Sequence, residues 1–211
     1  MPKTQPFDEH LDRYDNWFEE HRFVYSSEVE AVRHFIPPGK KGVEIGVGTG
    51  RFALPLGIKV GVEPSDVMAR FAARKGLLVI RGVAEALPFA DSVFDFALMV
   101  TTVCFVDYIE GSFREAHRIL KPNGRFIVGL VDRDSPLGKF YEKMKNENVF
   151  YRVATFYSSD EVTHYLKEVG FGDIEMVQTV FGDLQSIKEI QPYKEGCGEG
   201  GFVVIKATKV I

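Results

Sequence analysis

Cysteine, long apolar runs and excess positive charge are all scarce in this chain, and each shortage excludes a class of protein. There are two cysteines, Cys104 and Cys197, far apart in the sequence, which excludes a disulfide framework and fits a reducing compartment. The most apolar stretch, residues 94–106, contains Asp95 and is too short to span a bilayer. Lysine and arginine number 26 against 30 acidic residues, and the net charge of −4 argues against a nucleic-acid partner.

The sequence also has neither the apolar segment of a secretory signal near residue 1 nor the histidine spacing of a metal site. Residues 1–10 are polar and acidic and hold no apolar core of a secretory signal, so we expect a cytoplasmic protein. The five histidines show no H-x-x-x-H spacing, and we expect no metal. The rest is ordinary, because 211 residues with 45% hydrophobic and 27% charged content suit a single globular domain, residues 1–211.

An apolar strand runs into a glycine-rich loop over residues 42–50, which read Gly-Val-Glu-Ile-Gly-Val-Gly-Thr-Gly. Glycine accepts a positive φ and has no Cβ to keep a ligand away from the backbone, so this loop predicts a ligand contact. The spacing is G-x-G-x-G, and Arg51 stands where the dinucleotide fingerprint G-x-G-x-x-G has its third glycine. A nucleotide-dependent oxidoreductase is therefore a disfavoured alternative.

Two carboxylates accompany the loop. Glu44 lies inside the apolar strand, where a carboxylate is costly unless it caps loop amides or meets a cation. Glu63 ends the next apolar run, residues 58–63. A carboxylate at the tip of a second parallel strand can accept both hydroxyls of a ribose, so Glu63 is predicted to bind a ribose.

Strand and helix alternate from Lys40 onward, which predicts a parallel α/β sheet with right-handed crossovers. The expected strands are residues 41–45, 58–63, 77–81, 94–100, 125–131, 172–180 and 201–207. The expected helices are residues 7–35, 50–56, 65–75 with Ser65 as N-cap, 111–120, and one opened by a capping box at Ser158 and ended at Gly170. A second glycine-rich segment, residues 196–201, precedes a strand and is expected to be a loop without a ligand.

Five blocks occur in an order that resembles a known family. They are residues 44–50 (EIGVGTG), 62–65 (VEPS), 84–89 (AEALPF), 94–95 (FD) and 114–124 (REAHRILKPNG). Together they resemble the class I S-adenosylmethionine-dependent methyltransferases, in particular those that act on small molecules. The resemblance is strong over residues 40–131. It implies a Rossmann-like doubly wound sheet of seven strands in the order 3-2-1-4-5-7-6, parallel except for an antiparallel last strand, with helices on both faces.

The resemblance also implies S-adenosylmethionine as cofactor. The glycine loop would lie against its methionine part, Glu63 would hold the ribose, and Ala84 and Glu85 would contact the adenine. The full cofactor-binding set is Glu44, Gly46, Gly48, Gly50, Glu63, Pro64, Ala84, Glu85 and Thr101. Val83 departs from the pattern, because many relatives have an aspartate there that accepts from the adenine amino group. One lost hydrogen bond costs about 0.5–1.5 kcal/mol, so cofactor use is still expected.

The segments that would define the acceptor flank this region. The family implies that residues 1–38 form a helical lid over the cofactor, although simple packing on the sheet is the alternative, and that the aromatic-rich residues 132–157 cap the substrate. Methyl transfer is an in-line displacement at an activated carbon, which needs alignment and exclusion of water more than a fixed catalytic residue. Pocket-facing candidates for a catalytic role are Tyr14, Asp107, Asp132 and Tyr141. Cys104 is expected to be a small buried residue rather than a nucleophile.

The sequence thus predicts an S-adenosylmethionine-dependent methyltransferase that acts on a small-molecule acceptor, without a nucleic-acid or membrane partner. An inactive cofactor-binding sensor is the main alternative, because Val83 breaks the pattern and no catalytic base is evident. Neither the acceptor nor the oligomeric state can be read from the sequence.

Overall fold

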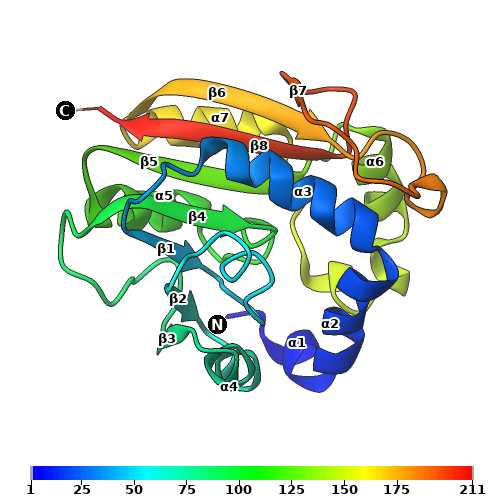
Figure 1. The fold of residues 1–211 in the computed structure, drawn as a ribbon, viewed down its shortest axis with the longest axis horizontal. Coiled ribbons are helices and arrows are strands. Elements are labelled where there is room, and N and C mark those ends of the chain that lie inside the picture. The colour runs from blue at the N-terminus through cyan, green and yellow to red at the C-terminus, as the bar shows by residue number, and fades with distance from the viewer. Residues whose placement is uncertain (1, 211) are drawn as a thin grey trace.

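A mixed sheet of eight strands runs through the computed structural model, which describes residues 2–210 (Figure 1). The strands are β1 (Gly42–Ile45), β2 (Val60–Glu63), β3 (Leu78–Arg81), β4 (Phe94–Val100), β5 (Leu120–Val131), β6 (Phe171–Thr179), β7 (Lys194–Glu195) and β8 (Phe202–Lys209). Their order is β3-β2-β1-β4-β5-β8-β6-β7. The expected α/β class and the order of the seven longer strands are confirmed.

The expected count of seven strands, with the last alone antiparallel, needs a correction. β8 is antiparallel to both β5 and β6, as expected, but β7 adds an eighth strand that is antiparallel to β6. This strand pairs only Lys194 and Glu195 with Gln178 and Val177, and both of its residues are exposed. Two polar residues at a sheet edge carry no apolar alternation that a sequence could reveal.

Seven α-helices and three short 3-10 helices complete the described chain. They are α1 (Gln5–Glu9), α2 (Leu11–Glu20), α3 (Arg22–Phe35), α4 (Asp66–Arg74), α5 (Ile109–Ile119), α6 (Pro136–Lys143), α7 (Ser159–Glu168), η1 (Lys145–Glu147), η2 (Tyr151–Val153) and η3 (Leu184–Ser186). Two helix starts are confirmed. The Ser65 side chain accepts a hydrogen bond from the Met68 amide at 3.0 Å, and Ser158 and Glu161 form a capping box.

The single helix expected over residues 7–35 is wrong, because the segment folds as α1, α2 and α3. The backbone leaves helical geometry at His10, where φ is −129° and ψ is 37°, and at His21, where φ is −109° and ψ is 40°. Each of the three helices presents its own spaced apolar residues to the core. The periodic pattern therefore runs across both breaks without marking them.

The helix expected over residues 50–56 is also wrong, since residues 51–57 form a series of turns. The Leu54 amide donates to Gly50 O at 3.1 Å and the Leu56 amide donates to Phe52 O at 3.3 Å. Pro55, between them, has no N–H and cannot donate to Arg51 O. The Tyr25 hydroxyl on α3 donates to that carbonyl oxygen instead.

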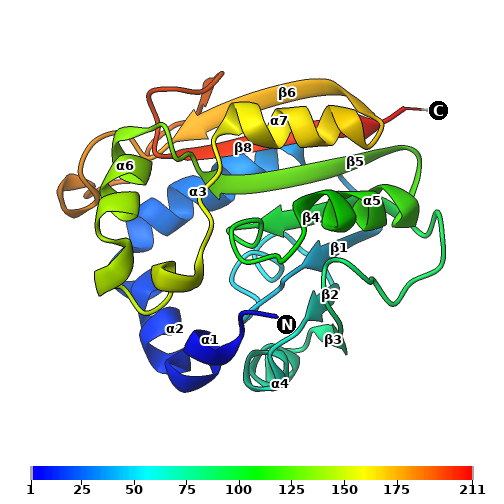
Figure 2. The same ribbon diagram turned by 180° about the vertical axis from the view of Figure 1, so that it is seen from behind.

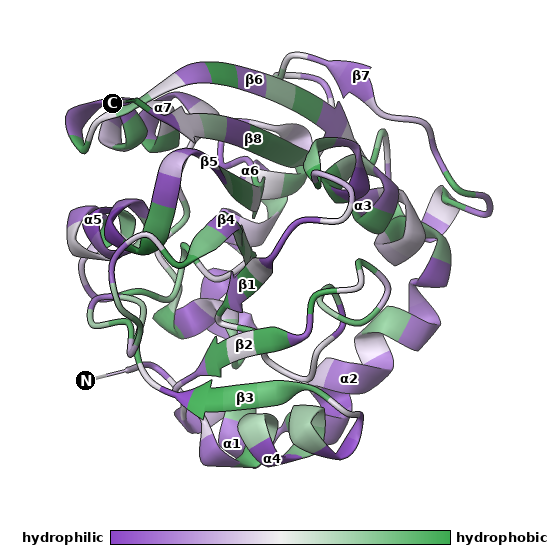
Figure 3. Cartoon of the chain, turned by 60° about the vertical axis from the view of Figure 1, so that its left-hand side comes forward, coloured by the Kyte–Doolittle hydropathy of each residue, from purple (hydrophilic) through white to green (hydrophobic). Residues whose placement is uncertain are grey.

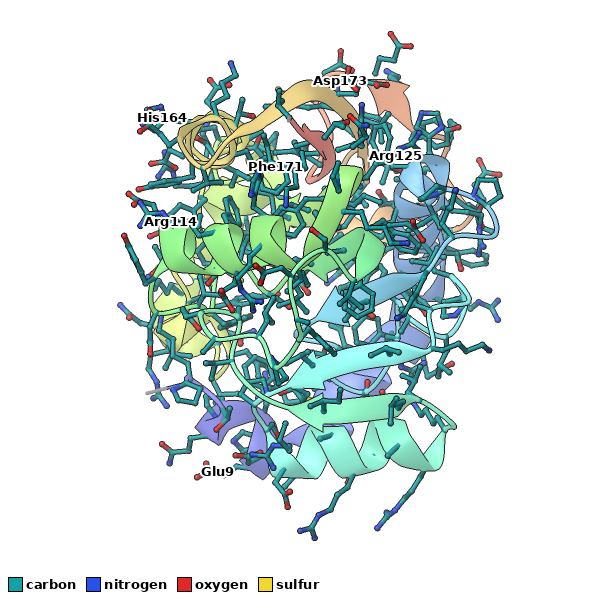
Figure 4. The ribbon with its side chains drawn as sticks, turned by 90° about the vertical axis from the view of Figure 1, so that its left-hand side faces the viewer. Glu9, Arg114, Arg125, His164, Phe171 and Asp173 are labelled. Carbon is teal, nitrogen blue, oxygen red and sulfur yellow. The ribbon has the colours of Figure 1, made fainter. Side chains whose placement is uncertain are left out.

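Helices cover both faces of the sheet, as Figures 1 and 2 show from opposite sides. Phe96 and Leu98 of β4 pack with α3 and the turns at 51–57, whereas Ala97 and Met99 pack with α5 and α7. Strands buried on both faces need continuous apolar sequence, and β4 has it except at Asp95. In Figure 3, β2 and β3 are mainly green, while α2 is largely hydrophilic. Figure 4 shows Arg114 of α5 and His164 of α7 at the periphery.

The carboxyl ends of the parallel strands β1, β2 and β4 meet at one edge of the sheet. The strand order reverses between β1 and β4, which is the position where open α/β sheets bind ligands. Helices α1, α2 and α6 gather beyond this edge, on the right in Figure 1. The fold therefore brings the glycine loop, the N-terminal helices and the segment after β5 to the same place.

Tyr25→Phe tests the hydrogen bond from the Tyr25 hydroxyl to Arg51 O, which replaces the backbone hydrogen bond that Pro55 cannot donate. Removal of the hydroxyl leaves Arg51 O without its partner in a part-buried position, and we expect a loss of about 1 kcal/mol in the free energy of unfolding. Urea denaturation measures it. The control is Tyr108→Phe, which removes a hydroxyl bonded to Glu110 on the surface. Equal effects of the two substitutions would contradict the role given to Tyr25.

Candidate active site

A cavity of about 360 Å³ lies at the carboxyl edge of β1, β2 and β4. Seven of the nine residues predicted to bind the cofactor line it, namely Gly46, Gly48, Glu63, Pro64, Ala84, Glu85 and Thr101. Glu44 and Gly50 do not line it. The structure thus brings together three segments that the sequence singled out separately: the loop after β1, the end of β2 and the turn after β3.

The loop after β1 uses glycine for geometric reasons. Gly46 and Gly48 have φ of 73° and 53°, a region that side chains rarely adopt. A Cβ at Gly46 would lie 2.4 Å from the Thr102 side chain. The Gly46 and Val47 amides both donate to Val62 O, at 2.8 and 3.0 Å, so the loop folds back over the end of β2.

Glu63 holds this loop to the next strand. Its Oε2 accepts from the Gly48 amide and its Oε1 from the Ser65 amide, each at 2.8 Å. Burial raises the pKa of Glu63 to about 6, although these two amide bonds oppose the shift. The carboxyl is therefore mainly ionised at neutral pH. Each oxygen keeps a free lone pair, and the side chain borders the cavity, where it can accept further hydrogen bonds.

Glu44 does not line the cavity and contacts the protein backbone instead. Its carboxyl is bonded to the Ala53 amide in the turns at 51–57, and its Oε2 has no partner among the described residues. Burial raises the pKa of Glu44 well above its usual range. Gly50 also has a structural reason, because only a residue without a Cβ leaves room for the Leu77 side chain, which would lie 2.6 Å from a Cβ at this position.

The turn after β3 forms the opposite wall. Val83 lines the cavity, and its carbonyl oxygen accepts from the Ala86 amide at 3.2 Å. Glu85 also lines it, and Glu85 Oε1 accepts from the amides of Asp107 and Tyr108, at 2.8 and 3.2 Å, just before α5. The Glu85 carboxylate thereby fixes the turn to the start of α5.

Thr101 ends β4 with φ of 49°, an unusual value for a β-branched residue. Its amide donates to Gly129 O at 2.8 Å, and its carbonyl oxygen accepts from Cys104 Sγ at 3.2 Å. Strain of this kind is often found at functional sites. Thr101 lines the first cavity and also a second, larger one.

The second cavity, of about 1390 Å³, lies between α2, α3, α6 and the segment around η2. Aromatic side chains dominate its walls, including Trp17, Phe140, Tyr141 and Tyr151. It shares four lining residues with the first cavity: Phe7, Tyr14, Thr101 and Phe105. The ring centroid of Phe7 lies 4.9 Å from that of Phe105 and 5.7 Å from that of Tyr14. These three rings therefore form the boundary between the two cavities.

The N-terminal helices are attached directly to the glycine loop. Arg51 donates to the carboxylate of Asp15 on α2 and to Glu19 Oε1 at 2.6 Å, and Thr49 Oγ1 donates to Asp15 Oδ1 at 2.7 Å. Burial raises the pKa of Asp15, but the hydrogen bonds from Arg51 and Thr49 outweigh it and lower the pKa overall. In addition, the Ser65 hydroxyl donates to Asp8 of α1.

The four candidates for a catalytic role occupy different places. Tyr14 borders both cavities, Asp107 the first and Tyr141 the second. Burial, with the nearby Glu63 and Glu44, raises the pKa of Tyr14 far above neutrality, so its hydroxyl stays protonated. Asp132 lines neither cavity. Its buried carboxylate accepts from Ser159 Oγ at 2.8 Å and the Asp134 amide at 3.0 Å, which ties the end of β5 to α7.

Cys104 lines the second cavity as a thiol. Burial raises its pKa to about 12, and a protonated thiol is a poor nucleophile. Among residues 2–210, no three His, Cys, Asp or Glu side chains gather in a way that could hold a metal ion. Over the same residues, every helix is too short or too polar to cross a bilayer.

Sequence reasoning missed Glu28 of α3. Its side chain lines the second cavity and is only 5% exposed. Burial raises its pKa to about 8. A signal was present, because Glu28 falls on the apolar stripe of α3, four residues after Val24 and four before Val32, where a charged residue is unusual.

Glu28→Gln tests this burial through the pH dependence of stability. The folded-state pKa near 8 exceeds the ordinary value of 4.5, so the native state holds a proton that the unfolded chain releases, and wild-type stability falls as pH rises toward 8. Relative to wild type, the variant should gain about 1 kcal/mol in unfolding free energy per pH unit between about pH 5 and 8. Glu30→Gln, half exposed on the same helix, is the control. Parallel pH profiles for wild type and Glu28→Gln would refute the assignment.

Comparisons with known proteins agree with this geometry. A family model described as a methyltransferase domain matches residues 43–128. A crystal structure from Thermotoga maritima, named as a SAM-dependent methyltransferase and possible histamine N-methyltransferase, is 52% identical, with a TM-score of 0.96 over 98% of this chain and 99% of that one.

Two curated relatives extend over most of the chain. An uncharacterized protein of Methanocaldococcus jannaschii is 47% identical over 97% of this chain and 98% of its own length. An uncharacterized protein of Mycobacterium tuberculosis is 34% identical over 99% of this chain and 75% of its own length. With the site geometry and the family match, these similarities show that the chain belongs to the class I S-adenosylmethionine-dependent methyltransferases, with S-adenosylmethionine as its cofactor.

Proposed function

We propose that the first cavity holds S-adenosylmethionine and that the enzyme transfers its methyl group to a small molecule bound in the second cavity. One observation carries this proposal: the two cavities meet at a boundary of four residues, so a donor in one and an acceptor in the other can be in contact. The shared residues Thr101, Tyr14, Phe7 and Phe105 would surround the transferred methyl group.

The residues of the first cavity fit the parts of the cofactor. The backbone at Gly46 and Gly48 lines the cavity and can lie against a methionine moiety, and the buried Glu63 carboxylate can accept the two ribose hydroxyls. Val83 and Ala84 offer an apolar surface to adenine. Because Val83 cannot accept a hydrogen bond through its side chain, the adenine amino group would be recognised by backbone carbonyl groups or by Glu85.

The cofactor supplies a methyl group already activated by its positive sulfur. The protein has to align the acceptor with the carbon–sulfur bond and exclude water, and alignment alone can lower such barriers by about 7–11 kcal/mol. The rings of Phe7 and Phe105 provide an apolar enclosure at the boundary. The Tyr14 hydroxyl lies 3.3 Å from the place that a Cβ at Gly48 would take, where it can donate a hydrogen bond to a bound group.

We further propose that the N-terminal segment acts as a lid. Pro2, Lys3, Thr4 and Phe7 line the first cavity, and Lys3 Nζ donates to Val106 O at 3.4 Å across it. The hydrogen bonds of Asp15 to Arg51 and Thr49 hold α2 against the glycine loop. Release of these contacts would open a path for the cofactor.

Glu63→Ala tests the cofactor site. Loss of the carboxylate removes the proposed ribose acceptor, and we expect affinity for S-adenosylmethionine and S-adenosylhomocysteine to fall at least about tenfold, as is usual when hydrogen bonds to a charged group are lost. Isothermal titration calorimetry measures both ligands. The control is Asp66→Asn, which removes a carboxylate three residues away that does not line the cavity.

Three outcomes are informative. Selective weakening by Glu63→Ala, with a normal unfolding curve, supports the site. Equal affinities of wild type and Glu63→Ala would place the ribose elsewhere. Product formation by the wild type with a panel of amine, hydroxyl and carboxyl acceptors distinguishes an enzyme from a cofactor-binding sensor.

Asp15→Asn tests the lid. The neutral side chain weakens the ion pair with Arg51, so S-adenosylhomocysteine should leave the protein at least about fivefold faster. Stopped-flow fluorescence can follow this, because Trp17 on α2 is the one tryptophan in the chain. Asp12→Asn, an exposed change on the same helix, should leave the rate unaltered. Unchanged release from Asp15→Asn would show that α2 does not gate the cofactor.

A further inference from the structure

The second cavity contains a carboxyl group that the fold does not satisfy. Glu28 is 5% exposed, and burial is the sole cause of its raised pKa, with no hydrogen bond or ion pair to its carboxyl among residues 2–210. Buried carboxyl groups are normally hydrogen-bonded or paired, because an unpaired one loses its hydration without compensation. Its side chain lines the cavity, so a ligand in that space can reach it.

Aromatic rings line the same cavity as this carboxyl. Tyr141 and Tyr151 stack with their ring centroids 4.5 Å apart, and both line the same cavity. Burial raises the pKa of both phenols, and the charge of Glu28 adds to the shift in each case, which shows that all three groups share one environment. The faces of aromatic rings attract cations and repel anions.

The charged side chains that line the second cavity are mostly negative, which also favours a cationic ligand. Apart from Glu28, whose raised pKa of about 8 keeps it mostly protonated at neutral pH until a cation binds, the described charged side chains of the lining are Glu20, Glu147 and Asp183 against Arg13. Glu20, Glu147 and Asp183 are exposed, so they act at the mouth of the cavity, whereas Glu28 lies inside. A cleft lined by one sign of charge concentrates ligands of the opposite sign.

We propose that the methyl acceptor carries an ammonium group, which pairs with Glu28 in the second cavity beside the stacked rings of Tyr141 and Tyr151. This inference rests on the proposed function, because it names the class of molecule that the second cavity receives. A neutral or anionic acceptor of the same shape would leave the buried carboxyl without a partner. A cation supplies that partner and also gains from the ring faces, so the site should select for charge as well as for shape.

The burial of Glu28 supports an ammonium group as its partner. It raises the pKa of Glu28 to about 8, which reflects the difficulty of placing a lone negative charge in this environment. A bound ammonium group compensates that charge, as expected of a site that is complete only with its ligand.

Binding of matched probes tests the proposal without knowledge of the natural acceptor. Benzylamine and phenethylamine, both cations at neutral pH, are compared with benzyl alcohol and phenethyl alcohol, which have nearly the same shape. Titrations are followed by ligand-observed NMR on protein saturated with S-adenosylhomocysteine. We expect each amine to bind at least about tenfold more tightly than its alcohol.

Glu28→Gln should reduce this preference to about twofold or less, because the amide keeps the shape and removes the charge. Glu30→Gln, which removes a half-exposed carboxylate on the same helix that does not line the cavity, should keep the full preference. Affinity for S-adenosylhomocysteine should be the same in all three proteins. Thermal unfolding verifies that Glu28→Gln is folded, and if it is not, the comparison of amine with alcohol on the wild type decides the question alone.

The possible failures are distinguishable. If S-adenosylhomocysteine binds but the amines show no preference over the alcohols, or do not bind at millimolar concentration, the ammonium proposal is overturned and the proposed function stands. If Glu28→Gln keeps the full preference, another group holds the cation and the role of Glu28 is refuted. If S-adenosylhomocysteine itself fails to bind, the proposed function falls as well.

Discussion

The site depends on the two hydrogen bonds that the Glu63 carboxylate accepts from the amides of Gly48 and Ser65. They join three pieces of the fold: the loop after β1, the end of β2 and the start of α4, whose N-cap is Ser65. Because the sheet already holds β1 beside β2, one buried carboxylate is enough to fix the loop between them. Packing fixes the position of Glu63, and its free lone pairs, which face the cavity, can accept hydrogen bonds from a ligand.

The features that could be predicted from the sequence are those with a local physical cause. The alternation of apolar runs predicts the strands and their parallel class, and the caps at Ser65 and Ser158 follow from residue type and spacing. The order of the seven longer strands comes only from the resemblance to the family. The glycine loop and Glu63 could be placed at one edge because carboxyl ends of parallel strands must meet there.

The features that escaped prediction arise from contacts between distant segments. Pro55 is visible in the sequence, but not the Tyr25 hydroxyl that takes over its lost hydrogen bond, 26 residues from Arg51. Thr101 adopts a positive φ that its residue type does not favour, because the surrounding strands fix it. Glu28 stands on the apolar stripe of α3, but the sequence could not show the cavity beside it, because residues 136–157, far along the chain, form much of its wall.

Arg51 connects two of the N-terminal helices to the glycine loop. Its side chain holds α2 through Asp15, and its carbonyl oxygen holds α3 through Tyr25, on the helix that also carries Glu28. A movement of α2, if it opens the cofactor cavity as proposed above, therefore acts on the same residue that anchors α3. Under that proposal, entry of the donor and the position of Glu28 are coupled through Arg51.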